Sequence, residues 1–374
     1  MIKHNKQSIT FFPLLILNTL ILGASAGDLE EEVNQQLDTK QGVVHKKRGQ
    51  FIAVPIPVSN PTIGSGLQAA LLYLHPPKND NSLNATSGLG AMYTNTESWL
   101  VGLFHDNYLF GDRLRLRTAL GTGSVNLDFY GTGSDPVFSE SPIEYLIESD
   151  LVYLRLLSRI PSTDYWFAGL SYTGMNTHIT FNLDNLIPDI PLLEDDMQLS
   201  GIGLVVNFDS TNNSYYPTQG KDFEVAINRN NDAWGSDFNY DKTTLSYNQY
   251  IPLSKQSTLA GRFFLSSIDG EAPFFVKPSL KMRGFASNRY QDDAATSAHL
   301  EWRYKFKPRW GFMLSLEAGE VADSVGQLNG GDIITSVGAG IRWQVAAAQP
   351  MHLGLDVGFS DGDSAIYVQV GEKF

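Results

Sequence analysis

Polar and apolar residues alternate with a period of two from Phe51 to the end of this 374-residue chain, in segments of about 9 to 18 residues separated by turn residues. The segment 332–345 is a clear case. Isoleucine, valine and tryptophan dominate one face, while serine, glycine, arginine and glutamine form most of the other. A period of two is that of a β-strand whose two faces meet different surroundings. The alternation therefore predicts an all-β fold for nearly the whole chain.

A membrane barrel explains this alternation better than a soluble β-sandwich, which also alternates but buries its apolar face in a core. The segments match the span of a tilted transmembrane strand, and glycines and aromatic residues recur near strand ends, as an interfacial girdle requires. An open sheet cannot cross a bilayer, because its edges would leave backbone groups unpaired in hydrocarbon. The sheet is therefore expected to close.

Short and long connections alternate along the chain. Phe110-Gly111-Asp112 and Lys307-Pro308-Arg309 are tight turns, whereas the connections 131–142, 183–196, 270–294 and 323–331 are longer. Short inner turns and long outer loops are typical of outer-membrane barrels. We therefore predict a sixteen-stranded antiparallel transmembrane β-barrel in the bacterial outer membrane, with strands at 51–58, 62–75, 85–96, 97–109, 111–129, 143–160, 163–180, 197–209, 219–231, 236–252, 256–269, 294–307, 309–322, 332–345, 350–360 and 363–374.

The first 26 residues have the pattern of a signal peptide. Lys3 and Lys6 precede an apolar run, and Ala24-Ser25-Ala26 supplies a small-residue cleavage site. An N-terminal membrane anchor is the alternative, but the apolar run is short and contains Pro13. We expect residues 1–26 to be a signal peptide, 27–50 a short periplasmic segment and 51–374 the barrel.

The chain ends in an aromatic residue at the close of the last predicted strand. Ile366, Val368, Val370 and Phe374 share one face of that strand, and Glu372 on the same face is expected near the water interface. Such an ending looks like the signal that barrel-assembly machinery reads in its clients. That machinery is therefore an expected partner during insertion of the protein itself.

Composition and motifs argue against nucleic-acid binding, cofactors and catalysis. The formal charge is −13, opposite to that of a nucleic-acid-binding surface, and the chain has no cysteine to hold a metal or act as nucleophile. Its histidines are not paired at metal-ligand spacing. His105-Asp106-Asn107 evokes a phospholipase-type barrel, but His105 more simply lines the lumen or a strand end. We predict no enzyme activity, no metal and no cofactor.

Several motifs in the C-terminal half resemble those of the BamA/TamA family, the bacterial surface antigen superfamily. The most specific is Arg283-Gly284-Phe285, which lies in the longest predicted outer loop, between the eleventh and twelfth strands. Further matches are Tyr216-Pro217-Thr218-Gln219-Gly220, Ala272-Pro273-Phe274, Glu301-Trp302-Arg303 and Leu316-Glu317-Ala318-Gly319. In this family the loop with the Arg-Gly-Phe motif folds back into the barrel lumen.

The resemblance implies that Arg283, Gly284 and Phe285 lie in the lumen. The alternation directs Glu301 and Glu317 inward too, and a desolvated guanidinium needs carboxylate partners. We therefore expect Arg283 to pair with Glu317, with Glu301 close by and the motif residues Arg303 and Gly319 as further luminal partners. A solvent-exposed loop arginine is the alternative.

Two prolines mark the first predicted strand. Pro55 and Pro57 are two residues apart, so both missing amides face the same neighbour, and proline suits a sheet edge. If the first strand closes against the last strand, which ends in Phe374, this seam is short of hydrogen bonds. In the family it is the proposed lateral gate. Alternatively, the prolines lie in a linker before the barrel.

The resemblance implies that the protein assists insertion or transport of proteins or lipids at the outer membrane. A secretion conduit for a dedicated exported protein and a passive channel or structural surface protein remain alternatives. Expected partners are outer-membrane lipids and lipopolysaccharide, a client membrane or secreted protein, and a second copy in a homodimer. Family members normally carry periplasmic POTRA domains of about 75 residues. Residues 27–50 are too few for one, so a variant without them is predicted.

Overall fold

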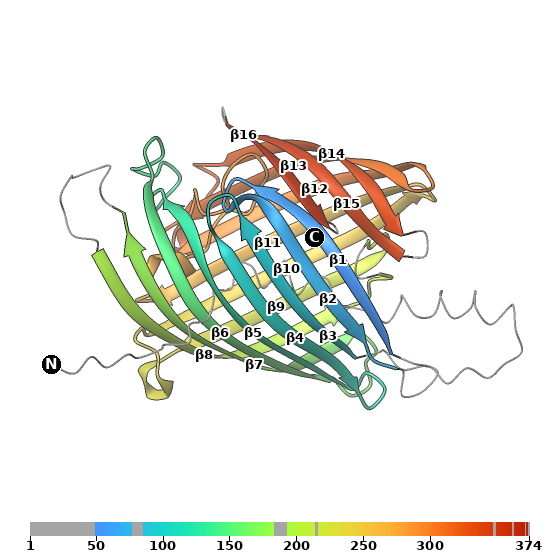
Figure 1. Cartoon of the computed structure of the whole chain (residues 1–374), viewed down its shortest axis with the longest axis horizontal. Helices are drawn as coiled ribbons and strands as arrows, with labels where there is room; N and C mark the ends of the chain where they lie inside the picture. Colours follow the sequence, from blue (N-terminus) through green and yellow to red (C-terminus); the bar gives the residue numbers. More distant parts are fainter. Residues whose placement is uncertain are drawn as a thin grey trace, which may run out of the picture.

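Sixteen antiparallel strands close into a single barrel, which confirms the predicted fold (Figure 1). The computed structural model describes residues 49–76, 85–182, 193–213, 216–346, 349–360, 363–370 and 372. Its strands are β1 (Gln50–Asn60), β2 (Gly64–Leu74), β3 (Thr86–Thr94), β4 (Trp99–Leu109), β5 (Leu114–Phe129), β6 (Ile143–Arg159), β7 (Trp166–Phe181), β8 (Leu193–Asp209), β9 (Gly220–Asn230), β10 (Tyr240–Ser254), β11 (Ser257–Gly270), β12 (Ala294–Lys307), β13 (Trp310–Ala322), β14 (Ile334–Ala346), β15 (Gln349–Ser360) and β16 (Asp363–Val370). The predicted signal peptide, most of the segment 27–50 and Phe374 lie outside the described residues.

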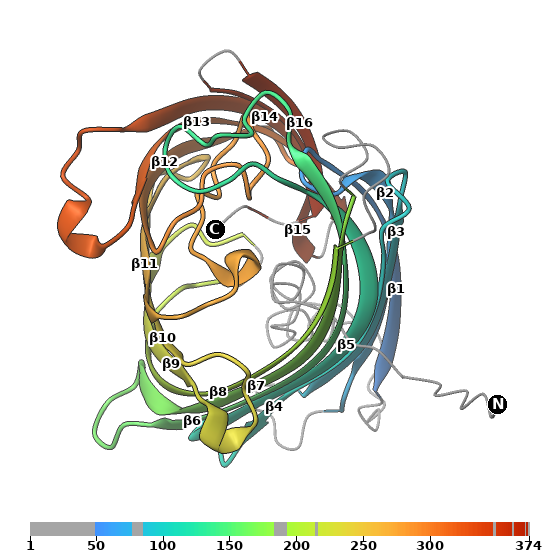
Figure 2. The same ribbon diagram turned by 90° about the vertical axis from the view of Figure 1, so that its left-hand side faces the viewer.

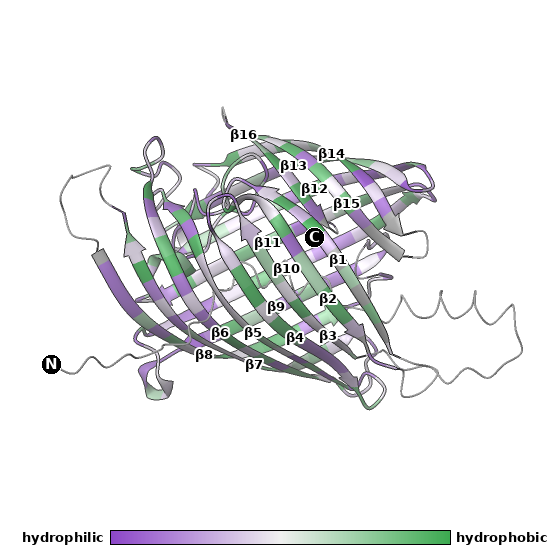
Figure 3. Cartoon of the chain, viewed as in Figure 1, coloured by the Kyte–Doolittle hydropathy of each residue, from purple (hydrophilic) through white to green (hydrophobic). Residues whose placement is uncertain are grey.

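The alternation of the sequence becomes the two surfaces of the barrel wall. Along β3, buried and exposed residues follow one another with a period of two. Its outward Leu89 is in register with Leu71 of β2 and Leu103 of β4, and the three side chains are 41%, 44% and 52% exposed. Figure 3 shows the resulting apolar colouring along the outer wall. An apolar outer band is what a membrane-crossing barrel presents to lipid.

The two ends of the barrel differ in their connections. At one end the chain turns sharply, as at 110–113, where Phe110, Gly111 and Asp112 all have positive φ angles of 56°, 68° and 60°. The other end carries the longer loops, with the short 3-10 helices η1 (Asp232–Trp234), η2 (Phe274–Val276) and η3 (Val325–Gln327). We call these the turn end and the loop end; the asymmetry assigns them to the periplasmic and outer sides.

Apart from the three 3-10 turns the described chain is strand and loop, and no helix in it has the length and apolar character needed to cross a membrane.

The closure between β1 and β16 is the weakest pairing of the wall. β1 is in register with β2 along its whole length, from Gln50↔Leu74 to Asn60↔Gly64. Between the described residues of β1 and β16, only Ser59↔Val368 is paired. β16 has 8 residues, whereas its other neighbour β15 has 12, so part of the β1 edge has no counterpart among the described residues of β16. We call this β1–β16 contact the seam.

Pro55 and Pro57 lie inside β1, not in a linker before it. The pairing with β2 runs without a register shift through Pro55↔Ala69 and Pro57↔Leu67. Proline has no amide proton to give to a ladder, so it is tolerated where the strand edge is unpaired. Because the pairing of β1 with β2 is uninterrupted, the two positions at which the prolines lack an amide proton are expected to face β16.

We expect the seam to appear in hydrogen–deuterium exchange of the detergent-solubilised barrel. Amides of β16 should exchange faster than those of β14, because backbone groups without a strand partner open at lower free energy. Equal protection of β16 and β14 would contradict a weak seam.

Candidate functional site: the luminal loop and its charge ring

The connection between β11 and β12, residues 271–293, lies inside the barrel. Figure 2, which looks along the barrel, shows this orange segment within the ring of strands. The loop folds on itself through an isolated bridge between Ser279 and Gln291 and a hydrogen bond from the Leu280 amide to the Tyr290 carbonyl, 3.0 Å long. Leu280, Met282, Phe285 and Tyr290 are buried with Ala295 of β12 and Val321 of β13. The loop therefore has a packed core of its own against the inner wall.

Arg283 is the most enclosed charged residue of this loop, with 2% of its surface exposed. Its guanidinium is 2.7 Å from a carboxylate oxygen of Glu301 on β12 and 3.1 Å from one of Asp356 on β15, and it is also paired with Glu317 on β13. The Arg283 amide donates a further 2.7 Å hydrogen bond to Glu317. Burial alone would lower the pKa of Arg283, but the three carboxylates outweigh it and raise the pKa, so the group stays charged.

Glycines in the wall make room for the loop to lie this close. A Cβ atom at Gly358 of β15 would lie 2.5 Å from Cβ of Arg283, and one at Gly338 of β14 would lie 2.8 Å from its Cδ. Gly284 has φ +104°, and a Cβ there would come within 2.8 Å of Ser360. Only glycine adopts this backbone conformation without strain. The Arg-Gly pair therefore rests directly on the backbone of the wall.

Six charged side chains form a closed ring of alternating sign around this contact, which we call the luminal charge ring. Glu301 lies 2.7 Å from Arg283 and 2.9 Å from Arg303. Glu372 lies 3.9 Å from Arg303 and 2.8 Å from Arg342. Asp356 pairs with Arg342 and lies 3.1 Å from Arg283, which closes the ring. In order, the members are Arg283, Glu301, Arg303, Glu372, Arg342 and Asp356. The ring thus joins the loop to β12, β14, β15 and the segment after β16.

Glu372 corrects one expectation from the sequence. A last strand running to residue 374 would have placed this carboxylate at the water interface, but β16 ends at Val370. The Glu372 side chain is 2% exposed and lies 2.8 Å from Arg342 and 3.9 Å from Arg303. A carboxylate facing lipid is costly, whereas two luminal guanidiniums offset its desolvation.

The loop also contacts β16 beyond the ring. The Gly284 amide donates to the Tyr367 hydroxyl over 2.9 Å, and that hydroxyl donates to the Phe285 carbonyl over 3.2 Å. Arg289 forms an ion pair with Asp363 at the start of the same strand. These contacts hold the inner side of β16 to the loop.

The same loop reaches the other side of the seam. The Ser287 amide donates to the Thr62 hydroxyl in the β1–β2 connection over 2.9 Å, and the two hydroxyl oxygens are also 2.9 Å apart. The loop therefore bridges β16 and the β1–β2 hairpin from inside, next to the one position at which the described residues of β1 and β16 are paired, Ser59↔Val368.

A second anchor holds the loop to the opposite wall. Phe274 in η2 packs against Phe129 of β5, Tyr145 of β6 and Phe181 of β7, with ring centroids 5.0, 5.2 and 5.5 Å apart. Tilted and edge-on aromatic pairs at these distances are favourable. The loop consequently crosses the lumen between an aromatic anchor and an ionic one.

Tyr216 covers the charge ring from the turn end. It belongs to the connection between β8 and β9 and is 6% exposed. Its ring centroid lies 4.3 Å from that of His352, 4.6 Å from Nζ of Lys305 and 5.9 Å from the Arg303 guanidinium carbon. The Tyr-Pro motif noted in the sequence thus lies beneath the site.

The structure brings together most of the residues singled out from the sequence. Arg283, Glu301, Glu317 and Arg303 form one network, and Gly319 lies under Leu280 and Met282 of the loop. Sequence reasoning missed three members of the ring: Asp356, Arg342 and Glu372. Arg342 and Asp356 each occupy the small, polar face of an alternating strand, and that is the signal that could have revealed them.

The three carboxylates that converge in the lumen surround an arginine rather than forming a metal site. Across the described part of the chain, no group of three or more histidine, aspartate or glutamate side chains is arranged to hold a metal ion.

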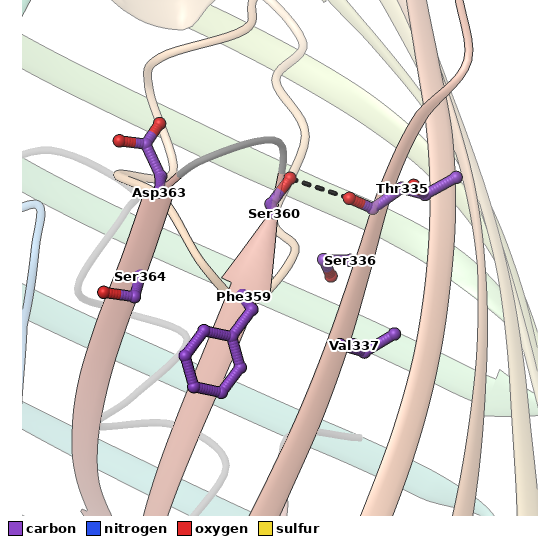
Figure 4. Close-up of a pocket in the computed structure, with 7 residues that line it drawn as sticks. All are labelled: Thr335, Ser336, Val337, Phe359, Ser360, Asp363 and Ser364. Atoms are coloured by element: carbon purple, nitrogen blue, oxygen red, sulfur yellow. Dashed lines mark hydrogen bonds between the residues drawn. The ribbon is translucent and has the colours of Figure 1, made fainter.

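A cavity of about 450 Å³ opens beside the site at the loop end of β14, β15 and β16 (Figure 4). Ser336, Phe359 and Asp363 are among the residues that line it, and the Ser360 hydroxyl at its edge donates to the Thr335 carbonyl over 2.7 Å. The lining offers hydroxyls and one carboxylate.

A closed sixteen-stranded barrel with an apolar outer band and a loop in its lumen is an outer-membrane β-barrel. Residues 79–374 match the Omp85 superfamily domain, and the chain therefore belongs to the Omp85 superfamily. The resemblance to BamA/TamA-type barrels seen in the sequence is thereby confirmed.

Solved structures of two kinds share this fold. BamA from Haemophilus ducreyi lacking POTRA domains 1-3 is 16% identical, with a TM-score of 0.57 over 87% of this chain and 70% of that chain. CdiB from Acinetobacter baumannii is 13% identical, with a TM-score of 0.55 over 87% of this chain and 60% of that one. CdiB from Escherichia coli is 11% identical, with a TM-score of 0.60 over 88% and 63%. No individual curated protein matches the sequence.

Arg283→Ala should destabilise the folded barrel by roughly 3–5 kcal/mol, because it leaves three buried carboxylates without their shared cation. The free energy of unfolding in urea and lipid vesicles measures this. Arg283→Ala combined with Glu317→Gln should cost less than the sum of the two single changes. The exposed pair of Arg229 with Asp241, 3.7 Å apart, is the control, and Arg229→Ala should cost at most about 1 kcal/mol. Additive effects of Arg283 and Glu317 would contradict the pairing.

Phe274→Ala should loosen the loop from β5, β6 and β7 while leaving the charge ring in place. We expect the conductance of the purified barrel in planar bilayers to rise above that of the wild type. Phe263→Ala removes an aromatic side chain from the outer face of β11 and should leave conductance unchanged. A Phe274→Ala barrel with wild-type conductance would show that the aromatic anchor does not hold the loop in the lumen.

Proposed function

We propose that this protein assists the insertion of proteins or lipids into the outer membrane through its seam, with the luminal loop controlling when the seam opens. The observation that carries the proposal is the seam itself. Among the described residues, β1 and β16 share a single paired position, two prolines occupy β1, and the loop bridges the gap from inside. A strand edge short of partners is a template to which another strand can add.

The charge ring connects the position of the loop to that of the C-terminal end. Arg283 of the loop pairs with Glu301 and Asp356. These carboxylates also pair with Arg303 and Arg342, the two arginines that hold Glu372 after β16, so displacing the loop changes the charge balance around the C-terminal end. Buried ion pairs are strongly coupled, since removing one partner leaves the other uncompensated. Loop release and seam opening are therefore expected to occur together.

Secretion is the second candidate, supported by the shared fold with two CdiB structures. A polypeptide passing through the lumen would require the loop to leave it, because Phe274 and Arg283 hold the loop to opposite walls. A passive channel is less well supported, since the loop lies across the lumen. None of these functions requires catalysis, and superfamily membership favours transport or insertion over an enzyme.

Partners follow from the proposed function. We infer that residues 1–26 direct export, that the barrel-assembly machinery inserts the chain, and that a client membrane or secreted protein engages the seam. Lipids and lipopolysaccharide surround the outer wall, and a homodimer would place two seams in proximity. The 27–50 segment is proposed to lie in the periplasm.

A disulfide across the seam tests the proposal. Ser59 and Val368 are direct partners, and antiparallel partners have Cα separations suitable for a disulfide. The natural chain has no cysteine, so Ser59→Cys with Val368→Cys is the only thiol pair. We expect the oxidised barrel to fail in complementing a deletion strain, measured by the amounts of outer-membrane proteins and lipids, and reduction to restore it.

The control lock joins Ala339→Cys to Val357→Cys, an outward pair in the well-paired β14–β15 ladder. It should leave activity intact in both redox states. Full activity of the oxidised seam lock would contradict insertion through the seam and favour the luminal conduit.

A further inference from the structure

The outer wall changes abruptly from apolar to polar at the turn end of β2, β3 and β4. Leu71, Leu89 and Leu103 form one outward row across these strands. The next outward row consists of Tyr73, Ser87 and His105, with Tyr73↔Ser87 and Ser87↔His105 in register. His75 stands one outward position further towards the turn end. This change marks the boundary between the hydrocarbon core of the membrane and the headgroup region.

One serine hydroxyl of this row, that of Ser87, links the imidazole of His105 in the row with that of His75 beyond it. The Ser87 Oγ lies 2.8 Å from Nε2 of His75 and 2.9 Å from Nδ1 of His105. The imidazole centroids are 5.5 Å apart, and Tyr73 packs on His75 with a centroid distance of 4.7 Å. Ser87, His75 and His105 thus bring a hydroxyl and two imidazoles within hydrogen-bonding distance of one another. The neighbouring outward row on the same strands carries only leucines.

We propose that Ser87 and His105, supported by His75, bind the phosphate group of a phospholipid in the leaflet at the turn end. A phosphate offers several acceptor oxygens and a negative charge, and it lies at the headgroup depth that this row occupies. When Nε2–H of His75 and Nδ1–H of His105 both donate to the Ser87 oxygen, the Ser87 hydroxyl proton is left to donate to the ligand. The acyl chains then lie along the leucine row above.

The same Ser–His contact does not favour an acyl-transfer site. A nucleophilic serine needs a base that is itself oriented by a third group. Asp106, the carboxylate next to His105 in the sequence, is buried on the opposite face of β4 and pairs with Arg117 at 2.6 Å. It cannot reach the imidazole on the outer face. Binding a phosphate requires only hydrogen-bond donors such as those of Ser87 and His105, and it needs no proton relay.

Native mass spectrometry of the purified full-length barrel tests the site with defined probes. Phosphatidylglycerol is the phosphate lipid, diacylglycerol with the same chains lacks the phosphate, and glycerol 3-phosphate supplies the headgroup alone. We expect the wild type to retain phosphatidylglycerol in preference to diacylglycerol. Ser87→Ala with His105→Leu should weaken this retention roughly tenfold, through loss of charge-assisted hydrogen bonds.

His178→Leu is the matched control, because His178 lies at the loop end of β7, where it bonds Asp196 over 2.9 Å. It should retain phosphatidylglycerol like the wild type. Heat-dependent gel migration checks that each variant is a folded barrel, and Ser87→Ala alone replaces the double variant if that one fails to fold.

Three results would overturn the proposal. Equal retention of phosphatidylglycerol and diacylglycerol removes the role of the phosphate, and wild-type retention by the folded Ser87 variant removes the role of the serine. Competition by glycerol 3-phosphate at lipid concentrations would show a free-anion site in place of a lipid site. None of these results depends on seam activity, so the site and the proposed function fail separately.

Discussion

A guanidinium shared by three buried carboxylates is the interaction on which the arrangement of this barrel depends. Arg283 cannot be desolvated in the lumen without compensation, and Glu301, Glu317 and Asp356 provide it from three different strands. The same carboxylates need cations in turn, so Arg303 and Arg342 complete the ring and draw Glu372 inward. Wall glycines at positions 338 and 358 allow the loop backbone to come this close. Electrostatics and packing thus fix the loop in one place.

The fixed loop also supports the closure of the barrel at the seam between β1 and β16. In hydrocarbon an unpaired backbone group costs several kcal/mol, so a barrel with a poorly paired seam needs support from elsewhere. Here β1 and β16 are joined at Ser59↔Val368, and the loop adds contacts to Tyr367 on one side and Thr62 on the other. The seam is consequently held from the inside, by bonds that can break together. The superfamily fold supplies the wall, and this internal support is what the proposed function would use.

Local patterns in the sequence predicted the barrel strands and part of the luminal site. Period-two alternation predicted the strands and their number, because lipid and lumen impose opposite chemistry on neighbouring residues. It also directed Glu301 and Glu317 inward, so the family motif at Arg283 could be paired with them. Alternation gives the face of a side chain but not its height or its neighbour around the barrel, and those depend on register. The inward face of Asp356 and Arg342 could be predicted, but their pairing with each other and with the loop, and the contacts of Phe274, could not. The inward course of Glu372 depended on the point at which β16 ends.

On this view of the barrel, the charge ring and the loop, rather than strand pairing, keep the seam closed. Spin labels on the outer residues of β1 and β16 report the seam width by double electron–electron resonance in lipid nanodiscs, with labels on β14 and β15 as the reference pair. In the wild type both distance distributions should be narrow. Arg283→Ala should broaden and lengthen the β1–β16 distribution and leave the β14–β15 distribution unchanged. A narrow, unshifted β1–β16 distance in folded Arg283→Ala barrels would contradict the account.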